Sequence, residues 1–233
     1  MRVSAATLIA LGAVCALVAL GVTDQVIPAV DPRTASLRPW IAARAMGVTA
    51  YLLLALEVGL GLVLSHPRNA AEWRKTKQVF PWHEMVTVFT GAFLALHVAL
   101  LAVDPFAHVG LIGAFVPGYS AYRPVGVALG SIALYALILT AVTAKWTRLL
   151  PSGWWLRIHR VAAAAFLLAW MHAVLSGTDG GTLLPLYVLT GGLILAGIGH
   201  RWWTARGHAR RVPATGPTPS LIAAPVAART EEG

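Results

Sequence analysis

The sequence predicts an all-α membrane protein, a six-helix transmembrane bundle with both termini in the cytoplasm. Of its 233 residues, 58% are hydrophobic and 12% are charged. Soluble domains average about 45–50% apolar and about 25% charged residues. This composition excludes a disordered chain and argues against an ordinary soluble enzyme. The apolar residues also come in blocks long enough to cross a bilayer, which needs about 20 residues of helix.

Six segments have the length and apolarity of a transmembrane helix. They are Ala5–Val22, Ile41–Ser65, Pro81–Val103, Pro124–Lys145, Trp154–Ser176 and Thr182–Trp202. We interpret the first segment as a retained helix, because its apolar run is longer than the roughly 7–15 residues of a signal peptide. Pro81 and Pro124 suit the first turn of the third and fourth helices, and Gly177 suits the end of the fifth.

The net charge of +9 mainly reports topology. Basic residues cluster after the second and fourth segments and after the sixth: Arg68, Arg74, Lys75, Lys77, Lys145, Arg148, Arg157, Arg201, Arg206, Arg210 and Arg211. The loops after the third and fifth segments hold only Arg123, and the loop after the first is mixed. The positive-inside bias therefore predicts a multi-pass protein of the cytoplasmic membrane with the basic loops and both termini inside. No basic patch is interleaved with exposed aromatic residues, so nucleic acid is not an expected partner.

The chain is expected to form one transmembrane domain, residues 1–203, followed by a disordered cytoplasmic tail, residues 204–233. The tail is rich in Ala, Pro, Thr and Arg and has no apolar periodicity. The single cysteine, Cys15, excludes a disulfide framework and a cysteine-based zinc or iron–sulfur site. No glycine-rich fingerprint follows a predicted strand, so a nucleotide-binding domain is not expected.

Four of the eight histidines lie in only two of the predicted helices. His83 and His97 lie in the third, and His159 and His172 lie in the fifth, at spacings of 14 and 13 residues. The two helices are separated by one span, so they cross the bilayer in the same direction. A rise of about 1.5 Å per residue places the histidines at two levels about 20 Å apart. His83 and His159 would then lie near the cytoplasmic side, and His97 and His172 toward the outer side.

Paired imidazoles on facing helices predict two haems stacked within the membrane. Neutral imidazole is a good axial ligand for haem iron, and one histidine from each helix would fill both axial positions. This ligation leaves no open position on the iron, so the expected role is electron transfer rather than oxygen binding. Small residues at 90–92 and 162–165 would provide flat surfaces for a macrocycle, although close helix packing explains them equally well.

The 13-residue spacing of the fifth helix is difficult to reconcile with this arrangement. A step of 14 residues on an ideal helix ends about 40° short of whole turns, whereas a step of 13 ends about 220° away. His159 and His172 would therefore point to different faces of one regular helix. A bend or bulge in the helix, or different orientations of the two haems, must absorb the difference.

Other polar residues are weaker candidates for the site. Arg160 follows a predicted ligand and could pair with a haem propionate, or it could simply mark the cytoplasmic interface. Arg44 and Arg123 could serve the outer haem in the same way, or snorkel to the interface. Glu57 lies within the second helix, where a carboxyl group is either a hydrogen-bonded structural residue or part of a proton path. Five residues near span ends or in tails are not predicted to be ligands: Glu84, His66, His108, His200 and His208.

The paired histidines resemble the ferric reductase-like transmembrane domain family. This family includes the haem-binding domains of ferric reductases, NADPH oxidases and the haem subunit of the bacterial methionine sulfoxide reductase system. The resemblance covers approximately residues 38–180. The runs at 44–47, 119–124, 155–160 and 177–179 look like an actinobacterial branch of stand-alone members. The resemblance implies that the first histidines of the two helices bind one haem b and the second histidines bind the other.

The expected function is an oxidoreductase-type electron conduit across the membrane. No flavin and nicotinamide domain like that of the oxidases is recognised, so the expected donor is a separate flavoprotein or a membrane quinol. By resemblance, the acceptor is ferric iron, an extracytoplasmic flavin-bearing protein or a sulfoxide reductase, and binding of a separate flavin stays open. Two alternatives are a quinol-linked cytochrome b subunit of a larger complex and a non-haem transporter with protonatable or metal-binding histidines.

Overall fold

The computed structural model describes residues 4–26, 31–66, 73–178 and 180–211, and all regular secondary structure in these ranges is helical. The helices are α1 (Ala5–Val26), α2 (Pro32–Leu64), α4 (Trp73–Val103), α5 (Gly110–Phe115), α6 (Pro124–Lys145), α7 (Trp154–His159), α8 (Val161–Ser176) and α9 (Gly180–Arg211). One 3-10 turn, Thr147–Leu149, connects α6 to the segment before α7. The all-helical class predicted from the sequence is thus confirmed for the described residues.

Five helical segments of the described chain are long and apolar enough to cross a membrane. They are Pro32–Leu64, Gln78–Val103, Pro124–Lys145, Trp154–Ser176 and Gly181–Arg206. Many of their large apolar side chains are exposed, including Leu189 and Leu193 of α9. A water-soluble protein would bury such side chains, whereas lipid accepts them. The multi-pass membrane protein predicted from the sequence is confirmed. Helix α1 contributes a shorter apolar stretch, Ile9–Ala19, and its role as a sixth span stays a prediction.

Several helices are longer than the sequence predicted. Helix α2 begins at Pro32 because Asp31 caps it: the Asp31 carboxylate accepts a hydrogen bond from the backbone N–H of Thr34 at 2.9 Å. An aspartate before a proline is a helix-start signal that the prediction of a start at Ile41 missed. The prediction that Pro81 begins a helix is wrong, since α4 starts at Trp73 and contains Pro81. Helix α9 continues to Arg211, so residues 204–211 are helical rather than part of a tail, and residues 212–233 lie outside the described residues.

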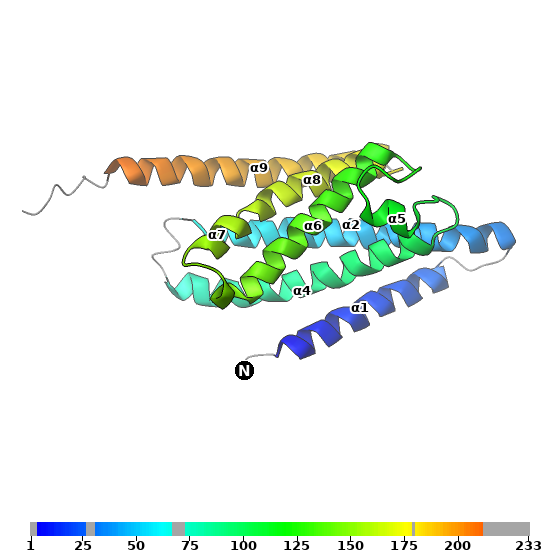
Figure 1. The fold of residues 1–233 in the computed structure, drawn as a ribbon, viewed down its shortest axis with the longest axis horizontal. Coiled ribbons are helices and arrows are strands. Elements are labelled where there is room, and N and C mark those ends of the chain that lie inside the picture. The colour runs from blue at the N-terminus through cyan, green and yellow to red at the C-terminus, as the bar shows by residue number, and fades with distance from the viewer. Residues whose placement is uncertain (1–3, 27–30, 67–72, 179, 212–233) are drawn as a thin grey trace, which may run out of the picture.

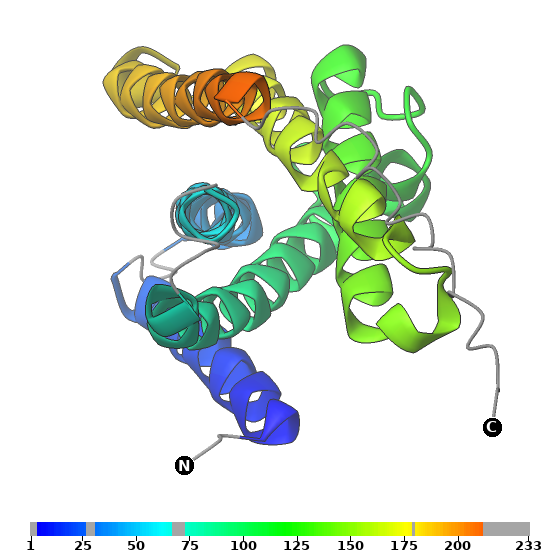
Figure 2. The ribbon, with the colours of Figure 1, turned by 90° about the vertical axis from the view of Figure 1, so that its left-hand side faces the viewer.

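The helices form a bundle in which successive long helices alternate in direction (Figure 1). Helix α2 contacts α4, α8 and α9, while α6 packs mainly against α8. Helix α1 lies on the outside of the bundle against α4, as the end-on view shows (Figure 2). Helices α1 and α9 run in opposite directions along the bundle (Figure 1). This arrangement leaves α2 and α6 as the flanking partners of the two histidine-bearing segments, α4 and α7–α8.

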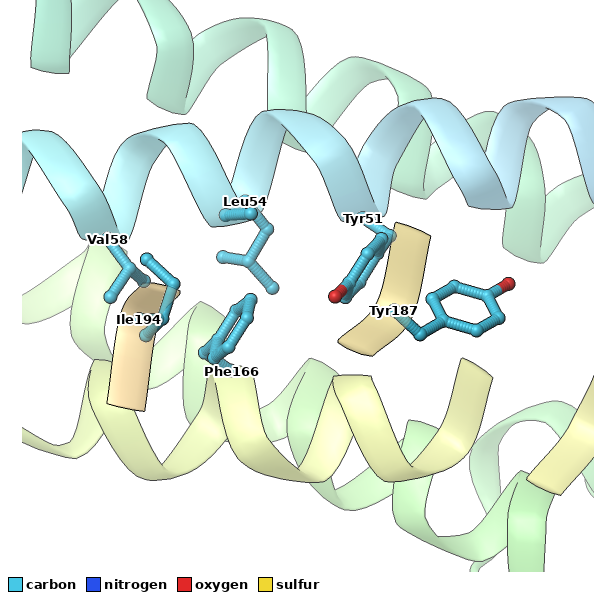
Figure 3. Close-up of a cluster of buried hydrophobic side chains, with 7 residues drawn as sticks. Tyr51, Leu54, Val58, Phe166, Tyr187 and Ile194 are labelled. Carbon is cyan, nitrogen blue, oxygen red and sulfur yellow. The ribbon is translucent and has the colours of Figure 1, made fainter. Parts of the chain in front are cut away.

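The main apolar core lies where α2, α8 and α9 meet (Figure 3). Phe166 of α8 is fully buried and stacks on Tyr51 of α2, with ring centroids 5.9 Å apart. Tyr51 also meets the edge of the Tyr187 ring at 5.3 Å and shares a short hydrogen bond with Thr190 of α9. Phe166 lies between His159 and His172 in sequence, so this core fixes α8 against α2 between the two histidine levels.

Replacing Phe166 by alanine should destabilise the bundle by about 3 kcal/mol, because the substitution leaves a cavity that three helices cannot close. The measurement is unfolding of the purified protein in detergent, by heat or by increasing denaturant. Leu193→Ala is the control, because Leu193 is 64% exposed whereas Phe166 is 0% exposed. Equal losses of stability in the two variants would contradict this account of the core.

Candidate functional site

The structure brings the four membrane histidines together two by two. The ring centroids of His83 in α4 and His159 in α7 lie 6.1 Å apart. Those of His97 in α4 and His172 in α8 lie 6.3 Å apart. We call these the inner pair and the outer pair. Because α4 is one continuous helix, its two histidines are separated by about 20 Å along the helix axis.

Both distances match two imidazoles that face one metal from opposite sides. In such a site each ligating nitrogen lies about 2 Å from the metal and about 1 Å from the centre of its own ring, so the ring centres lie about 6 Å apart. The ring planes are tilted by 33° in the inner pair and by 75° in the outer pair. The geometry of the described residues therefore fits bis-histidine ligation at two levels of the bundle.

The outer histidines are both oriented by backbone carbonyl groups. Nδ1 of His97 lies 2.7 Å from the carbonyl oxygen of Ala43 in α2, and Nδ1 of His172 lies 2.8 Å from that of Gly126 in α6. A carbonyl oxygen can only accept, so each Nδ1 must carry the hydrogen. Each Nε2 then keeps its lone pair. A metal-binding histidine is normally held in this way, with its second ring nitrogen donating to a carbonyl or carboxylate.

A glycine four residues after each of these carbonyls makes room for the imidazole ring. A Cβ atom on Gly47 of α2 would lie 2.7 Å from Cε1 and Nδ1 of His97. A Cβ atom on Gly130 of α6 would lie 2.6 Å from Nδ1 of His172. Both positions thus tolerate only hydrogen as the side chain while the rings stay in place. The sequence pattern does not predict this arrangement, in which one helix turn supplies both the acceptor and the space.

His83 of the inner pair is held differently, by side chains rather than by backbone. Nδ1 of His83 lies 3.3 Å from the Thr87 hydroxyl oxygen, which itself donates to Oε1 of Glu57 in α2 at 2.8 Å. Nδ1 of His159 is buried and faces the backbone of Thr140 in α6, although the contact does not reach the geometry of a full hydrogen bond.

An apolar cavity adjoins the outer pair. Residues of α2, α4, α6, α8 and α9 surround it, and His97 and His172 both line it. The centre of a water molecule can move through about 160 Å³ of this cavity, room for on the order of ten waters. Its lining is mostly aliphatic and aromatic, and Arg44 is the arginine among the described residues that line it. Such a space suits a flat apolar group that carries an anionic edge.

The break between α7 and α8 resolves the 13-residue spacing of the predicted fifth helix. Helix α7 ends at His159, Arg160 lies at the junction, and α8 begins at Val161. The N–H of Ala163 bonds to the carbonyl of Arg160, three residues back, instead of making the four-residue bond of an α-helix. The span predicted over Trp154–Ser176 is present, and of the solutions left open by the sequence the structure shows a bend, which lies directly after His159. His159 and His172 can consequently approach α4 from separate helices.

The remaining candidates occupy different places. Arg160 is exposed at the α7–α8 junction. Arg123 precedes α6 with a φ of 40°, and its Nη1 donates to the carbonyls of Leu175 and Gly177 at 2.7 and 3.1 Å, so it caps the end of α8. Arg44 lines the outer cavity, so of these two arginines it is the one beside the outer pair.

Of the histidines not predicted as ligands, two meet at the opposite end of the bundle from α5. The rings of His66 and His200 stack with centroids 5.4 Å apart, and the sequence pattern does not predict this contact because it joins residues 134 positions apart. His108 and Glu84 are exposed. His208 belongs to α9, but its side chain lies outside the described part of the chain.

Within the described residues, no group of three or more His, Cys, Asp or Glu side chains could hold a metal ion. A haem needs only two protein ligands, because the porphyrin supplies the other four. The chain matches no protein-family model, no curated protein and no solved structure.

Substituting Gly47 by alanine should destabilise the protein by about 1–3 kcal/mol, because the methyl group would collide with the His97 ring. Gly61→Ala is the matched control on the same helix, since its Cβ would lie 3.4 Å from Nε2 of His83, an ordinary contact. There the gain in helix propensity should leave the stability unchanged or raised by up to about 1 kcal/mol. Thermal unfolding in detergent measures both. The same sign of effect in both variants would disprove the close approach of His97 to α2.

Proposed function

We propose that the protein carries electrons across a membrane through two haem b groups, each held between two histidines. The observation that carries this proposal is the equal separation of the two histidine pairs, 6.1 and 6.3 Å, at the distance that two axial ligands require. His83 and His159 would bind the haem nearer the cytoplasm, and His97 and His172 the haem nearer the outer face. Bound haem supplies one-electron redox chemistry and leaves no position open for oxygen.

The residues of the chain then have distinct tasks. His97 and His172 bind through Nε2, while the carbonyls of Ala43 and Gly126 fix their ring orientation. The apolar lining of the outer cavity excludes water, which keeps the haem environment at low dielectric. Arg44 is the residue we assign to a haem propionate at the outer level, because it lines the cavity. Arg160 is assigned the same role at the inner level on its position after His159 alone.

The proposal includes the family and topology suggested by the sequence. The chain would be a stand-alone ferric reductase-like protein of the cytoplasmic membrane, with six spans and both termini inside. Electrons would enter at the inner pair from a separate flavoprotein or from quinol, and leave at the outer pair to an extracytoplasmic acceptor. The order of the sites along α4 supports this route, because the inner and outer pairs lie near opposite ends of one transmembrane helix.

The test is the haem content of the purified protein. A pyridine haemochrome assay should find two b-type haems per chain, reducible by dithionite. His97→Ala and His172→Ala should each remove one haem and leave the other, because each substitution deletes one axial ligand. His108→Ala, which changes an exposed histidine outside the pairs, should keep two.

Absence of a b-type spectrum in the wild-type protein would refute the proposed function. So would retention of both haems in His97→Ala and His172→Ala. A purified protein without colour that transports a metal or protons through the membrane would instead support the transporter alternative.

A further inference from the structure

Glu57 is a carboxyl residue within a membrane span, and its surroundings connect it to the inner histidine pair. Its Oε1 accepts a hydrogen bond of 2.8 Å from the hydroxyl of Thr87 in α4. The same hydroxyl oxygen lies 3.3 Å from Nδ1 of His83, one helical turn earlier. Ionisable groups inside membranes are costly and usually serve a function. The three side chains form a continuous polar chain from α2 to the ring of His83.

Which atoms donate in this series of hydrogen bonds follows from the number of hydrogen atoms available. The Thr87 hydroxyl has one hydrogen, and two oxygens compete for it at 2.8 Å: Oε1 of Glu57 and the backbone carbonyl of His83. Whichever of these two oxygens accepts the hydrogen, the Thr87 oxygen keeps its lone pairs and can accept a hydrogen bond from the His83 ring. Nδ1 of His83 is then the donor. Thr87 thus takes the place that a backbone carbonyl has at each outer histidine, and Glu57 stands behind it.

The position of Glu57 on α2 supports this equivalence. Ala43, whose carbonyl holds His97, precedes Gly47 by four residues, and Glu57 precedes Gly61 by four residues. Ala43 and Glu57 are 14 residues apart, as are Gly47 and Gly61 and the two histidines of α4. The same turn of α2 therefore recurs at the two levels, with a side-chain acceptor at the inner level in place of a backbone acceptor.

We infer that Thr87 and Glu57 are positioning residues that lower the reduction potential of the inner haem. This inference rests on the proposed function. A hydrogen bond from the second ring nitrogen to an acceptor makes the imidazole a stronger electron donor to its metal, which favours the oxidised iron. A carboxyl group behind the hydroxyl strengthens the effect by polarising the chain. At the outer level the Ser176 hydroxyl lies 3.4 Å from Nδ1 of His172, beside the Gly126 carbonyl, but no carboxyl group among the described residues stands behind it, so the two haems would differ in potential.

The experiment is a redox titration of the purified protein, followed by visible absorbance, which resolves one-electron components for the two haems. The component that His97→Ala retains identifies the inner haem. Thr87→Val keeps the side-chain shape and removes the oxygen, so the inner potential should rise. We expect at least a tenfold change in the equilibrium constant for reduction, or about 59 mV for one electron. Glu57→Gln keeps an acceptor of equal size and should shift the same component upward by less.

Two variants serve as controls. Thr87→Ser keeps the hydroxyl and should leave both potentials at their wild-type values. Thr49→Val removes a hydroxyl on α2 that bonds only to the Ala45 carbonyl of its own helix, and should also change neither potential. A purely structural role for Thr87 would affect stability without moving a single component of the titration.

The outcomes separate the two proposals. A wild-type protein without haem refutes the proposed function itself. A wild-type protein with two haems refutes only this inference if Thr87→Val and Glu57→Gln leave the inner potential unchanged, or if the outer component moves instead. If Thr87→Val loses the inner haem, the inner potential of Glu57→Gln alone tests the inference. This variant should keep the haem, because its isosteric amide retains the hydrogen bond from Thr87.

Discussion

The hydrogen bonds between imidazole Nδ1 atoms and the neighbouring helices are the interactions on which the rest of the site depends. His97 donates to Ala43 of α2, and His172 donates to Gly126 of α6. A membrane interior offers no water to a polar ring, so each histidine must find its partner within the bundle. These bonds set the tautomer and the direction of the rings. They also require α2 to approach the His97 ring closely and α6 to approach the His172 ring closely. This explains why a glycine lies against each ring.

The two histidine levels are built with different acceptors, and this difference has chemical consequences. A helix carbonyl has the same chemistry at every position, and no side-chain substitution removes it. The inner level instead uses Thr87 and Glu57, whose polarity can vary. In the proposed two-step electron path, unequal potentials at the two sites would give the flow a direction. The bundle thus holds two similar histidine pairs in surroundings that distinguish them.

Much of this organisation could be predicted from the sequence because it depends on local properties. Apolar composition and segment length indicated a helical membrane protein, and the structure has five helical segments suited to a membrane. The axial levels of the histidines follow from the rise per residue, which is the same in every helix. Helix ends were predicted less well. Helix α2 begins at Pro32, after its Asp31 cap, rather than at Ile41, and α4 extends through Pro81. Pro81 was taken as a boundary, whereas α4 accommodates it inside, and Pro124 does begin α6 as predicted.

The sequence by itself determined that four histidines lie at two depths of an apolar helical bundle. Only the tertiary structure decided which atoms meet them, since that depends on how helices distant in sequence pack. The Ala43 and Gly126 carbonyls carry no signal in the sequence, because every residue has a carbonyl group. The break at Arg160 was equally hidden, although the 13-residue spacing required some irregularity. Rotation about a helix axis is a property of its neighbours' packing, so the orientation of each ring became definite only in the folded bundle.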